Sequence, residues 1–224
     1  MKRTIFGLVS LLALAITTLA QYTNQSQPFY LVLVSHDENY NGTVLGACHE
    51  GAGIEGLCTG GLLNATSGYS TFQFNTSSDE FVQNANLGEW GYLTYELRGG
   101  NFNGELASSL NLQPEMPPSS PYVVSEPMGI SYNLASNVAL PLFTPSEETA
   151  TPVAFDADNR MNIQSYLDDT ATPPADQNVT AYYRWYVCES NYSGYTYETL
   201  NWVMGKYPPE NPSCCKVDVV RQFV

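Results

Sequence analysis

The sequence predicts an all-β protein with a single domain, an antiparallel β-sandwich of the jelly-roll type stapled by disulfides. A closed β-barrel is the alternative. Three observations support this fold class. Helical periodicity is nearly absent from the 224 residues. Short apolar runs recur between clusters of Pro, Gly, Ser, Thr and Asn, which is typical of short strands joined by turns. Five cysteines follow an export signal, and disulfides are common in small exported domains.

Residues 1–20 have the pattern of a secretory signal peptide. The basic pair Lys2-Arg3 precedes an apolar run over Ile5–Ile16, and small residues end the segment. The run is shorter than the roughly 20 residues that a membrane-spanning helix needs. We therefore expect residues 21–224 to form one secreted, extracellular or cell-wall domain with no membrane anchor.

The strand predictions follow the apolar runs in chain order. Phe29–Ser35 is almost continuously apolar, as expected of a strand that is buried on both faces. Other runs rich in aromatic and β-branched residues, each bounded by turn-forming residues, predict the remaining strands. These are Thr71–Phe74, Gly91–Leu97, Tyr122–Ser125, Asn137–Phe143, Met161–Leu167, Tyr182–Cys188, Thr199–Met204 and Lys216–Phe223.

Two proline-rich segments separate groups of predicted strands. Gln113–Pro121 holds four prolines and two serines, and Ala171–Ala175 holds two adjacent prolines. Neither half of the chain alone has many strands. We therefore interpret both segments as surface loops within one domain rather than as linkers.

The alternation of side chains along the strands predicts which of the last three cysteines pair. In Tyr182–Cys188 the inner face is expected to carry Trp185, which leaves Cys188 on the more polar face. Cys214 also falls on the polar face of its strand, so we predict a Cys188–Cys214 disulfide. Cys215 is then expected to be a buried free thiol, unusual in an exported protein. A strained Cys214–Cys215 ring is the alternative.

Cys48 and Cys58 bracket a glycine-rich segment that holds His49, Glu50 and Glu55. We expect a Cys48–Cys58 disulfide that staples this segment as a loop. A histidine beside a carboxylate can act as a general base, so these three residues are candidates for binding or catalysis. The alternative, which we favour, is that they satisfy the loop's own backbone by hydrogen bonds.

The net charge restricts the classes of binding partner, and the sequons predict glycosylation. Without Lys2 and Arg3 the chain carries 6 basic and 22 acidic residues, a net charge of −16. Such a polyanion repels nucleic acid and anionic membranes. Several Asn-x-Ser/Thr sequons behind a signal peptide predict a glycoprotein with these asparagines on its surface. They are Asn24, Asn41, Asn64, Asn75, Asn178 and Asn191.

Taken together, six segments resemble a family of small secreted, cell-surface-associated proteins of filamentous fungi with no established activity. They cover nearly all of the mature chain in order: FYLVLVS, ACHEGAGIEGLC, SNVALPLF, VAFDADNRMNIQSYLDD, YYRWYVCES and NPSCCKVDV. The resemblance implies a fungal origin and offers no catalytic residues. It also implies a single cysteine before KVDV, so Cys215 is a departure and Cys214 the structural partner.

Oxygen-rich clusters predict turns rather than a cation site, and we predict no metal or cofactor. His36-Asp37-Glu38 precedes a turn-forming segment, and no metal-binding spacing is present. Asp156–Asn159 and Asp168-Asp169 flank the strand Met161–Leu167, and calcium bound there is the alternative.

Enzymatic chemistry has little support in the sequence. No Gly-x-Ser-x-Gly motif is present. Glycoside hydrolysis needs only two carboxylates at the right separation, so an acid-active carbohydrate enzyme stays open. Its candidate carboxylates are Glu89, Glu96, Glu189 and Glu198.

Aromatic residues gather towards the C-terminus and suggest carbohydrate binding, because sugar rings stack their C–H faces on aromatic rings. Trp185 and Trp202 are expected in the core. The candidate ligand-binding tyrosines are Tyr182, Tyr186, Tyr195 and Tyr197. We expect a non-catalytic, monomeric protein of the cell wall or host interface that binds a polysaccharide or a protein. A secreted effector that acts on a host or competitor is a further alternative.

Overall fold

A computed structural model describes residues 22–63, 68–77, 86–99, 122–168 and 170–224. Nearly all regular structure in these ranges is β-strand, with one short 3-10 turn, η1 (Glu147–Thr149), and no α-helix. The strands are β1 Asn24–Gln25, β2 Phe29–Val34, β3 Val44–Gly51, β4 Ile54–Gly61, β5 Gln73–Thr76, β6 Trp90–Gly99, β7 Tyr122–Ser131, β8 Val138–Phe143, β9 Val153–Phe155, β10 Met161–Asp168, β11 Ala175–Tyr182, β12 Trp185–Tyr192, β13 Tyr195–Val203, β14 Cys215–Lys216 and β15 Asp218–Phe223.

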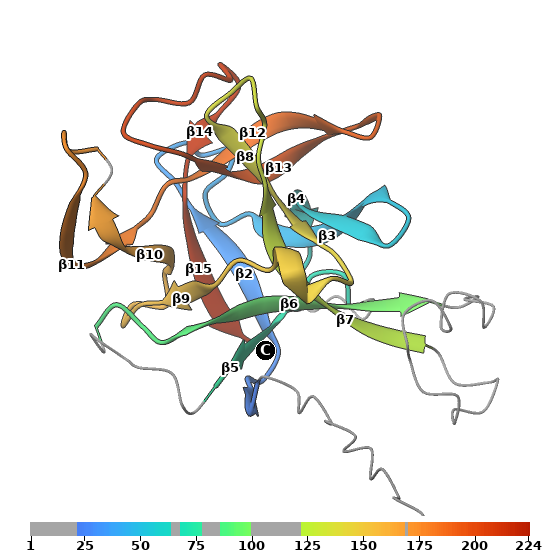
Figure 1. Ribbon diagram of the computed structural model, residues 1–224. Coiled ribbons are helices and arrows are strands. Elements are labelled where there is room, and N and C mark those ends of the chain that lie inside the picture. Colours follow the sequence, from blue (N-terminus) through green and yellow to red (C-terminus); the bar gives the residue numbers. More distant parts are fainter. Residues whose placement is uncertain (1–21, 64–67, 78–85, 100–121, 169) are drawn as a thin grey trace, which may run out of the picture.

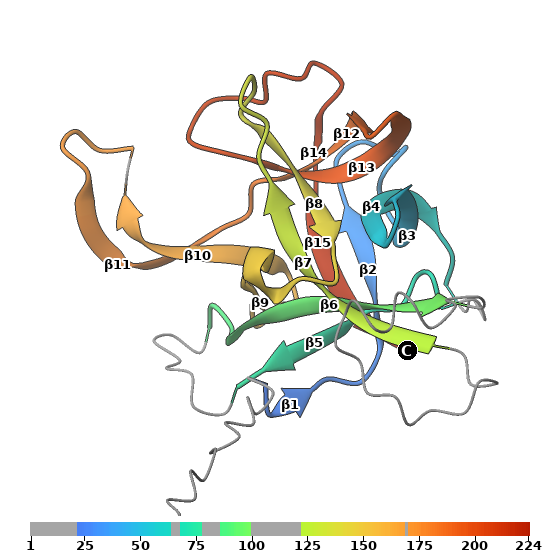
Figure 2. The same cartoon turned by 45° about the vertical axis from the view of Figure 1, so that its right-hand side comes forward.

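The strands form one curled antiparallel sheet. Its order is β11-β10-β9-β6-β7-β8-β13-β4-β3-β2-β15, while β5 and β1 extend from β6, and β12 and β14 from β13. Arg160, just before β10, bridges Val220 of β15, so the two ends of this path approach each other. The β10–β11 hairpin projects from the rest of the sheet (Figures 1 and 2). The predicted all-β class is confirmed, and a β-sandwich or half-barrel describes the curled sheet.

The core lies inside this curl. Phe29, Leu31 and Leu33 of β2 point inward at alternate positions and are fully buried. Trp185 and Trp202 pack edge to face at 4.7 Å between ring centroids. The Trp185 Nε1–H donates to the Met161 carbonyl at 2.8 Å, which satisfies its one buried donor. The predicted core position of both tryptophans is confirmed.

Most predicted strands are present with shifted ends, but the expected loop around Cys48 and Cys58 is wrong. This segment belongs to a β-hairpin of β3 and β4, which turns at residues 52–53. Glycines lowered its apparent strand propensity, yet the hairpin needs some of them. A Cβ at Gly61 would lie 2.5 Å from the Leu45 carbonyl oxygen, so only glycine lets the strands approach there.

Two further strand predictions need correction, because Tyr182–Cys188 and Lys216–Phe223 are each divided between two strands, the latter between β14 and β15. The segment Tyr182–Cys188 is divided between β11, which ends at Tyr182, and β12, which begins at Trp185. The strands β1, β9 and β11 had no prediction. No residue of β11 is buried, so it lacks the apolar alternation that marks a half-buried strand. Ala171–Ala175 lies at the β10–β11 connection, as a loop within the domain.

Both predicted disulfides are confirmed. Cys48 bonds to Cys58 and Cys188 to Cys214, with Cα–Cα distances of 5.8 and 4.1 Å. Cys188 is 1% exposed and lies in a second small apolar cluster rather than on a polar surface. Cys215 is free, as predicted, but it is half-exposed rather than buried, because β14 lies at the margin of the sheet beside β12 only.

The predicted sequons differ in exposure. Asn24, Asn41, Asn178 and Asn191 have exposed side chains, whereas Asn75 is half-buried with its Oδ1 enclosed. Asn64, the signal peptide and the segment 113–121 lie outside the described residues.

Candidate functional site

An aromatic surface forms where the β12–β13 hairpin meets the β3–β4 hairpin. The Tyr195 and Tyr197 rings lie 6.3 Å apart with only 7° between their planes. The His49 ring meets Tyr195 edge to face at 5.2 Å. We call His49, Tyr195 and Tyr197 the aromatic platform. It joins predicted residues from two separate parts of the sequence.

The β12–β13 hairpin fixes which side chains share this face. Tyr192 pairs directly with Tyr195, so both project to the side that carries Tyr197. Ser193 and Gly194 turn the chain with φ of 50° and 91°. Two positive φ values in a two-residue turn are the type I′ geometry that suits the twist of a hairpin.

Tyr182 and Tyr186, the other predicted binding tyrosines, lie elsewhere. The Arg184 guanidinium lies 4.4 Å from the Tyr182 ring centroid, and the Tyr182 hydroxyl accepts from Gln177 at 2.7 Å. Tyr186 packs beside the Cys188–Cys214 disulfide, with the Lys216 ammonium 5.2 Å from its ring centroid. Both tyrosines have structural partners, so the platform contains only part of the predicted set.

An open groove of about 730 Å³ borders the same hairpin. The connection from β7 to β8 supplies Tyr132, Asn133 and Leu134, and β12 supplies Glu189 and Tyr192. Tyr132 is 63% exposed. The groove thus combines exposed rings with amide and carboxylate groups. The sequon residue Asn191 also belongs to its lining.

Glu55 of β4 meets a partner that the sequence did not reveal, Glu126 of β7. Both side chains are buried, and their carboxyl groups share a hydrogen bond. Burial, the hydrogen bond to Glu55 and the charge of Glu55 all raise the pKa of Glu126. Burial also raises the pKa of Glu55, opposed by the bond from Glu126 and by the nearby His49. Glu126 therefore holds a proton that it donates to Glu55.

This carboxyl pair is unsuited to glycoside hydrolysis. The two catalytic carboxyls of a glycosidase stand about 5 Å or more apart, with the sugar between them. Glu55 and Glu126 are in direct contact and nearly fully buried. A buried pair that shares a proton instead makes folding sensitive to pH.

The four carboxylates considered for hydrolysis do not assemble either. Glu189 and Glu198 are cross-strand neighbours, but only Glu189 lines the groove. The Glu198 carboxylate accepts from the Tyr40 hydroxyl at 2.9 Å. Glu96 pairs with Arg98 at 3.1 Å, and Glu89 lines a separate hollow near β1.

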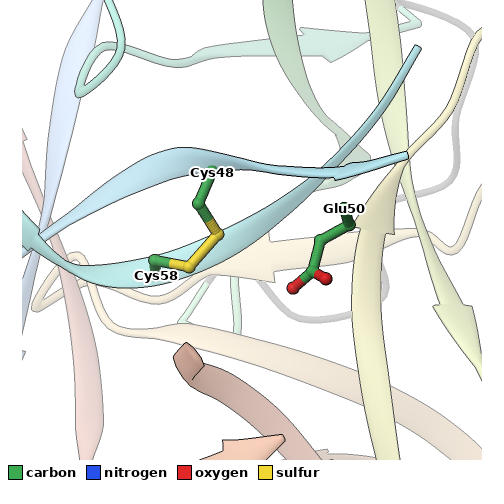
Figure 3. Close-up of side chains that lie close together, drawn as sticks. All are labelled: Cys48, Glu50 and Cys58. Carbon is green, nitrogen blue, oxygen red and sulfur yellow. A yellow bond between two sulfur atoms is a disulfide. The ribbon is translucent and has the colours of Figure 1, made fainter. Parts of the chain in front are cut away.

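Glu50, the third predicted residue of the β3–β4 segment, faces the Cys48–Cys58 disulfide (Figure 3). It is 1% exposed, and its Oε2 has no hydrogen-bond partner among the described residues. Burial alone raises the pKa of Glu50 to about 7. His49 and Glu55 are cross-strand neighbours, and His49 acts on the Glu55 carboxyl, whereas Glu50 faces the disulfide, so the three residues do not form one constellation.

Two of the acidic clusters predicted as turns, those at Asp37 and Asp156, are turns, whereas Asp168 is the last residue of β10. Asp156 Oδ1 accepts from the Asp158 and Arg160 amides at 2.9 and 2.8 Å. Its Oδ2 accepts from Arg160 Nε and the Tyr183 hydroxyl. These four bonds occupy both oxygens within the protein. Asp37 similarly accepts from the Asn39 amide, and Asp169 lies outside the described residues.

Sequence reasoning missed Glu126 and Tyr132 as site residues. Glu126 cannot be identified from its own segment, because its role depends on β7 lying near the β3–β4 hairpin. Tyr192 belongs to the aromatic cluster near the C-terminus but was not selected for binding, although the turn residues Ser193-Gly194 between two strand-like runs predict a hairpin that pairs it with Tyr195.

Comparison with protein families gives one match. Residues 26–223 match the model of a domain of unknown function, DUF7907, and the chain therefore belongs to that family. No curated protein and no solved structure matches the chain. Within the described ranges, no helix is long and apolar enough to cross a membrane.

Proposed function

We propose that this DUF7907 protein is a non-catalytic extracellular protein of a filamentous fungus that binds a neutral polysaccharide of the cell wall or host surface. The observation that carries the proposal is the aromatic platform. Two nearly parallel tyrosine rings in one strand, with a histidine ring beside them, suit stacking against successive sugar units.

The physical reason lies in the two faces of a sugar ring. Its axial C–H groups form an apolar face that packs on an aromatic ring and displaces water. Its hydroxyls need hydrogen-bond partners once that water is lost. The groove beside the platform supplies such partners through Asn133 and Glu189, and further stacking surface through Tyr132 and Tyr192.

Charge restricts the class of glycan. With 22 acidic against 8 basic residues, the protein repels polyanionic chains such as pectic or sulfated polysaccharides. A neutral glucan or chitin suffers no such repulsion. The two disulfides favour an oxidising, extracellular setting.

The test is binding to insoluble β-glucan, cellulose and chitin, followed by calorimetry with soluble oligosaccharides of the polymer that binds. One aromatic contact contributes about 1 kcal/mol, so Tyr195→Ala and Tyr197→Ala should each weaken binding about fivefold. Tyr166→Ala is the matched control, because Tyr166 is 60% exposed on β10, away from the platform. It should leave the affinity unchanged.

Two results would overturn the proposal. One is no retention on any of the three polymers at pH 4 to 7. The other is equal loss of affinity in the platform variants and in Tyr166→Ala, which would indicate nonspecific adsorption through exposed rings. Release of reducing sugar that Glu189→Gln abolishes would instead favour the enzyme alternative.

A further inference from the structure

The Cys48–Cys58 disulfide has an acidic neighbour. A Glu50 carboxylate oxygen and the two sulfurs all lie within 4.8 Å of one another (Figure 3). Such a trio resembles a metal-ligand set, but the sulfurs are bonded to each other and offer no thiolate. The contact between the carboxyl and the disulfide therefore needs another explanation.

Glu50 is costly where it lies. Its side chain is 1% exposed, and the buried Oε2 has no hydrogen-bond partner in the described residues. A buried polar group without a hydrogen-bond partner destabilises the folded state. Gly56 makes the position available, since a Cβ there would lie 2.9 Å from Glu50 Oε1. An unsatisfied buried group in a native protein calls for an explanation, and a catalytic or redox role is one such explanation.

The two cysteine residues differ in exposure. Cys48 is half-buried, whereas Cys58 is 8% exposed. A thiolate from solution therefore reaches Cys48 more readily and expels Cys58 into the interior of the sheet. We propose that Cys48–Cys58 is a redox-active disulfide, exchanged with dithiol partners, and that Glu50 delivers the proton to the departing Cys58 sulfur.

The step balances as follows. One thiolate of a dithiol attacks Cys48 Sγ, the Cys48–Cys58 bond breaks, and its electron pair goes to Cys58 Sγ, which takes the Glu50 proton. The second thiol of the partner then attacks the partner's own sulfur in the mixed disulfide, its proton passes to the departing Cys48 sulfur, and the partner leaves as an intramolecular disulfide. The dithiol loses two electrons and becomes a disulfide, the two cysteines gain them, and solvent returns the proton to Glu50.

The surroundings of Glu50 favour this role. Of its hairpin neighbours, His49 packs its ring against Tyr195, and Glu55 shares a hydrogen bond with Glu126. Burial alone therefore sets the pKa of Glu50, at about 7. The carboxyl thus holds its proton in acid and releases it near neutrality, which is the range required of a general acid.

The test measures reduction of each disulfide by a small dithiol, with alkylation and mass-spectrometric peptide mapping at successive times. The full mature protein is used, from pH 5 to 8.5, with rates expressed per dithiol thiolate. Cys188–Cys214 serves as an internal reference. Glu50→Gln keeps the side-chain size and removes the proton. Glu55→Gln is the matched control, a buried glutamate of the same hairpin that faces Glu126 instead.

At pH 5, Glu50→Gln should slow reduction of Cys48–Cys58 at least tenfold, since a positioned acid contributes about 10²–10⁴ in rate. The Cys188–Cys214 rate and the Glu55→Gln protein should be unchanged. The rate advantage of wild type should disappear as the pH rises to 8.5, because the wild-type carboxyl is then ionised. Equal rates at pH 5, equal slowing of both disulfides, or a difference confined to pH 8.5 would each overturn the proposal. The last result would indicate altered stability alone.

Discussion

Replacing Glu50 by glutamine should flatten the dependence of stability on pH. The pKa of Glu50 rises from 4.5 in the unfolded chain to about 7 in the folded protein because the carboxyl is buried. Below pH 4.5 both states hold the proton and stability is complete. Between pH 4.5 and 7 only the folded state holds it, so each pH unit lowers the free energy of unfolding by about 1.4 kcal/mol. The total loss is about 3 kcal/mol.

Urea unfolding from pH 4 to 8.5, followed by fluorescence of the buried Trp185 and Trp202, measures this loss. Wild type and Glu50→Gln should be equally stable at pH 4, and the variant should be about 3 kcal/mol more stable at pH 8. Glu38→Gln is the control, because Glu38 is exposed. Curves for wild type and Glu50→Gln that stay parallel between pH 4.5 and 7.5 would refute the reasoning.

Three other predictions concern packing, charge and thiols. Gly56→Ala should lower the free energy of unfolding by about 1–3 kcal/mol, since the new Cβ would clash with Glu50 and lie 3.3 Å from Cys48 Sγ; unchanged urea stability would contradict the tight fit. Asp156→Asn should destabilise the protein by about 1–3 kcal/mol at pH 7, because the Arg160 ion pair weakens. Burial opposes the shift, but hydrogen bonds and Arg160 lower the pKa of Asp156 overall. Its contribution is thus present above pH 3.8 and lost as pH falls through the lower folded value, and an acid titration that keeps the difference constant would count against this. Alkylation in denaturant without reductant should label one thiol per chain and none in Cys215→Ser; two labels in wild type would disprove the disulfide assignment.

The local pattern of apolar residues was enough to predict a strand when the strand's own residues show which of its faces are buried. Phe29–Ser35 predicts β2 because both faces of that strand are apolar, and alternation within β12 placed Trp185 in the core. The β3–β4 hairpin was missed because its glycines serve close backbone approach at Gly61 and space for a carboxyl at Gly56. Both requirements come from residues of the facing strand, which the strand propensity of a segment does not take into account.

The site was predictable only in part for the same reason. Tyr195 and Tyr197 share a face by strand alternation, so their pairing follows from the sequence. Their contact with His49 requires two hairpins that lie more than a hundred residues apart in the chain to meet. The Glu55–Glu126 bond likewise depends on β4 and β7 reaching the same part of the curled sheet.

The position of His49 connects the proposed binding surface to the buried acids. Its neighbours in β3 are Cys48, which is fixed by the disulfide, and Glu50, whose ionisation destabilises the folded protein. Glu55, opposite His49 in β4, belongs to a carboxyl pair that also needs its proton. Rising pH therefore weakens the hairpin that holds one third of the aromatic platform, while Tyr195 and Tyr197 stay on β13. Polysaccharide binding should accordingly be strongest in acid and weaken through neutrality, and Glu50→Gln should extend it to higher pH. Affinity that is constant from pH 4 to 8 in both proteins would mean that the platform does not depend on the protonation of this hairpin.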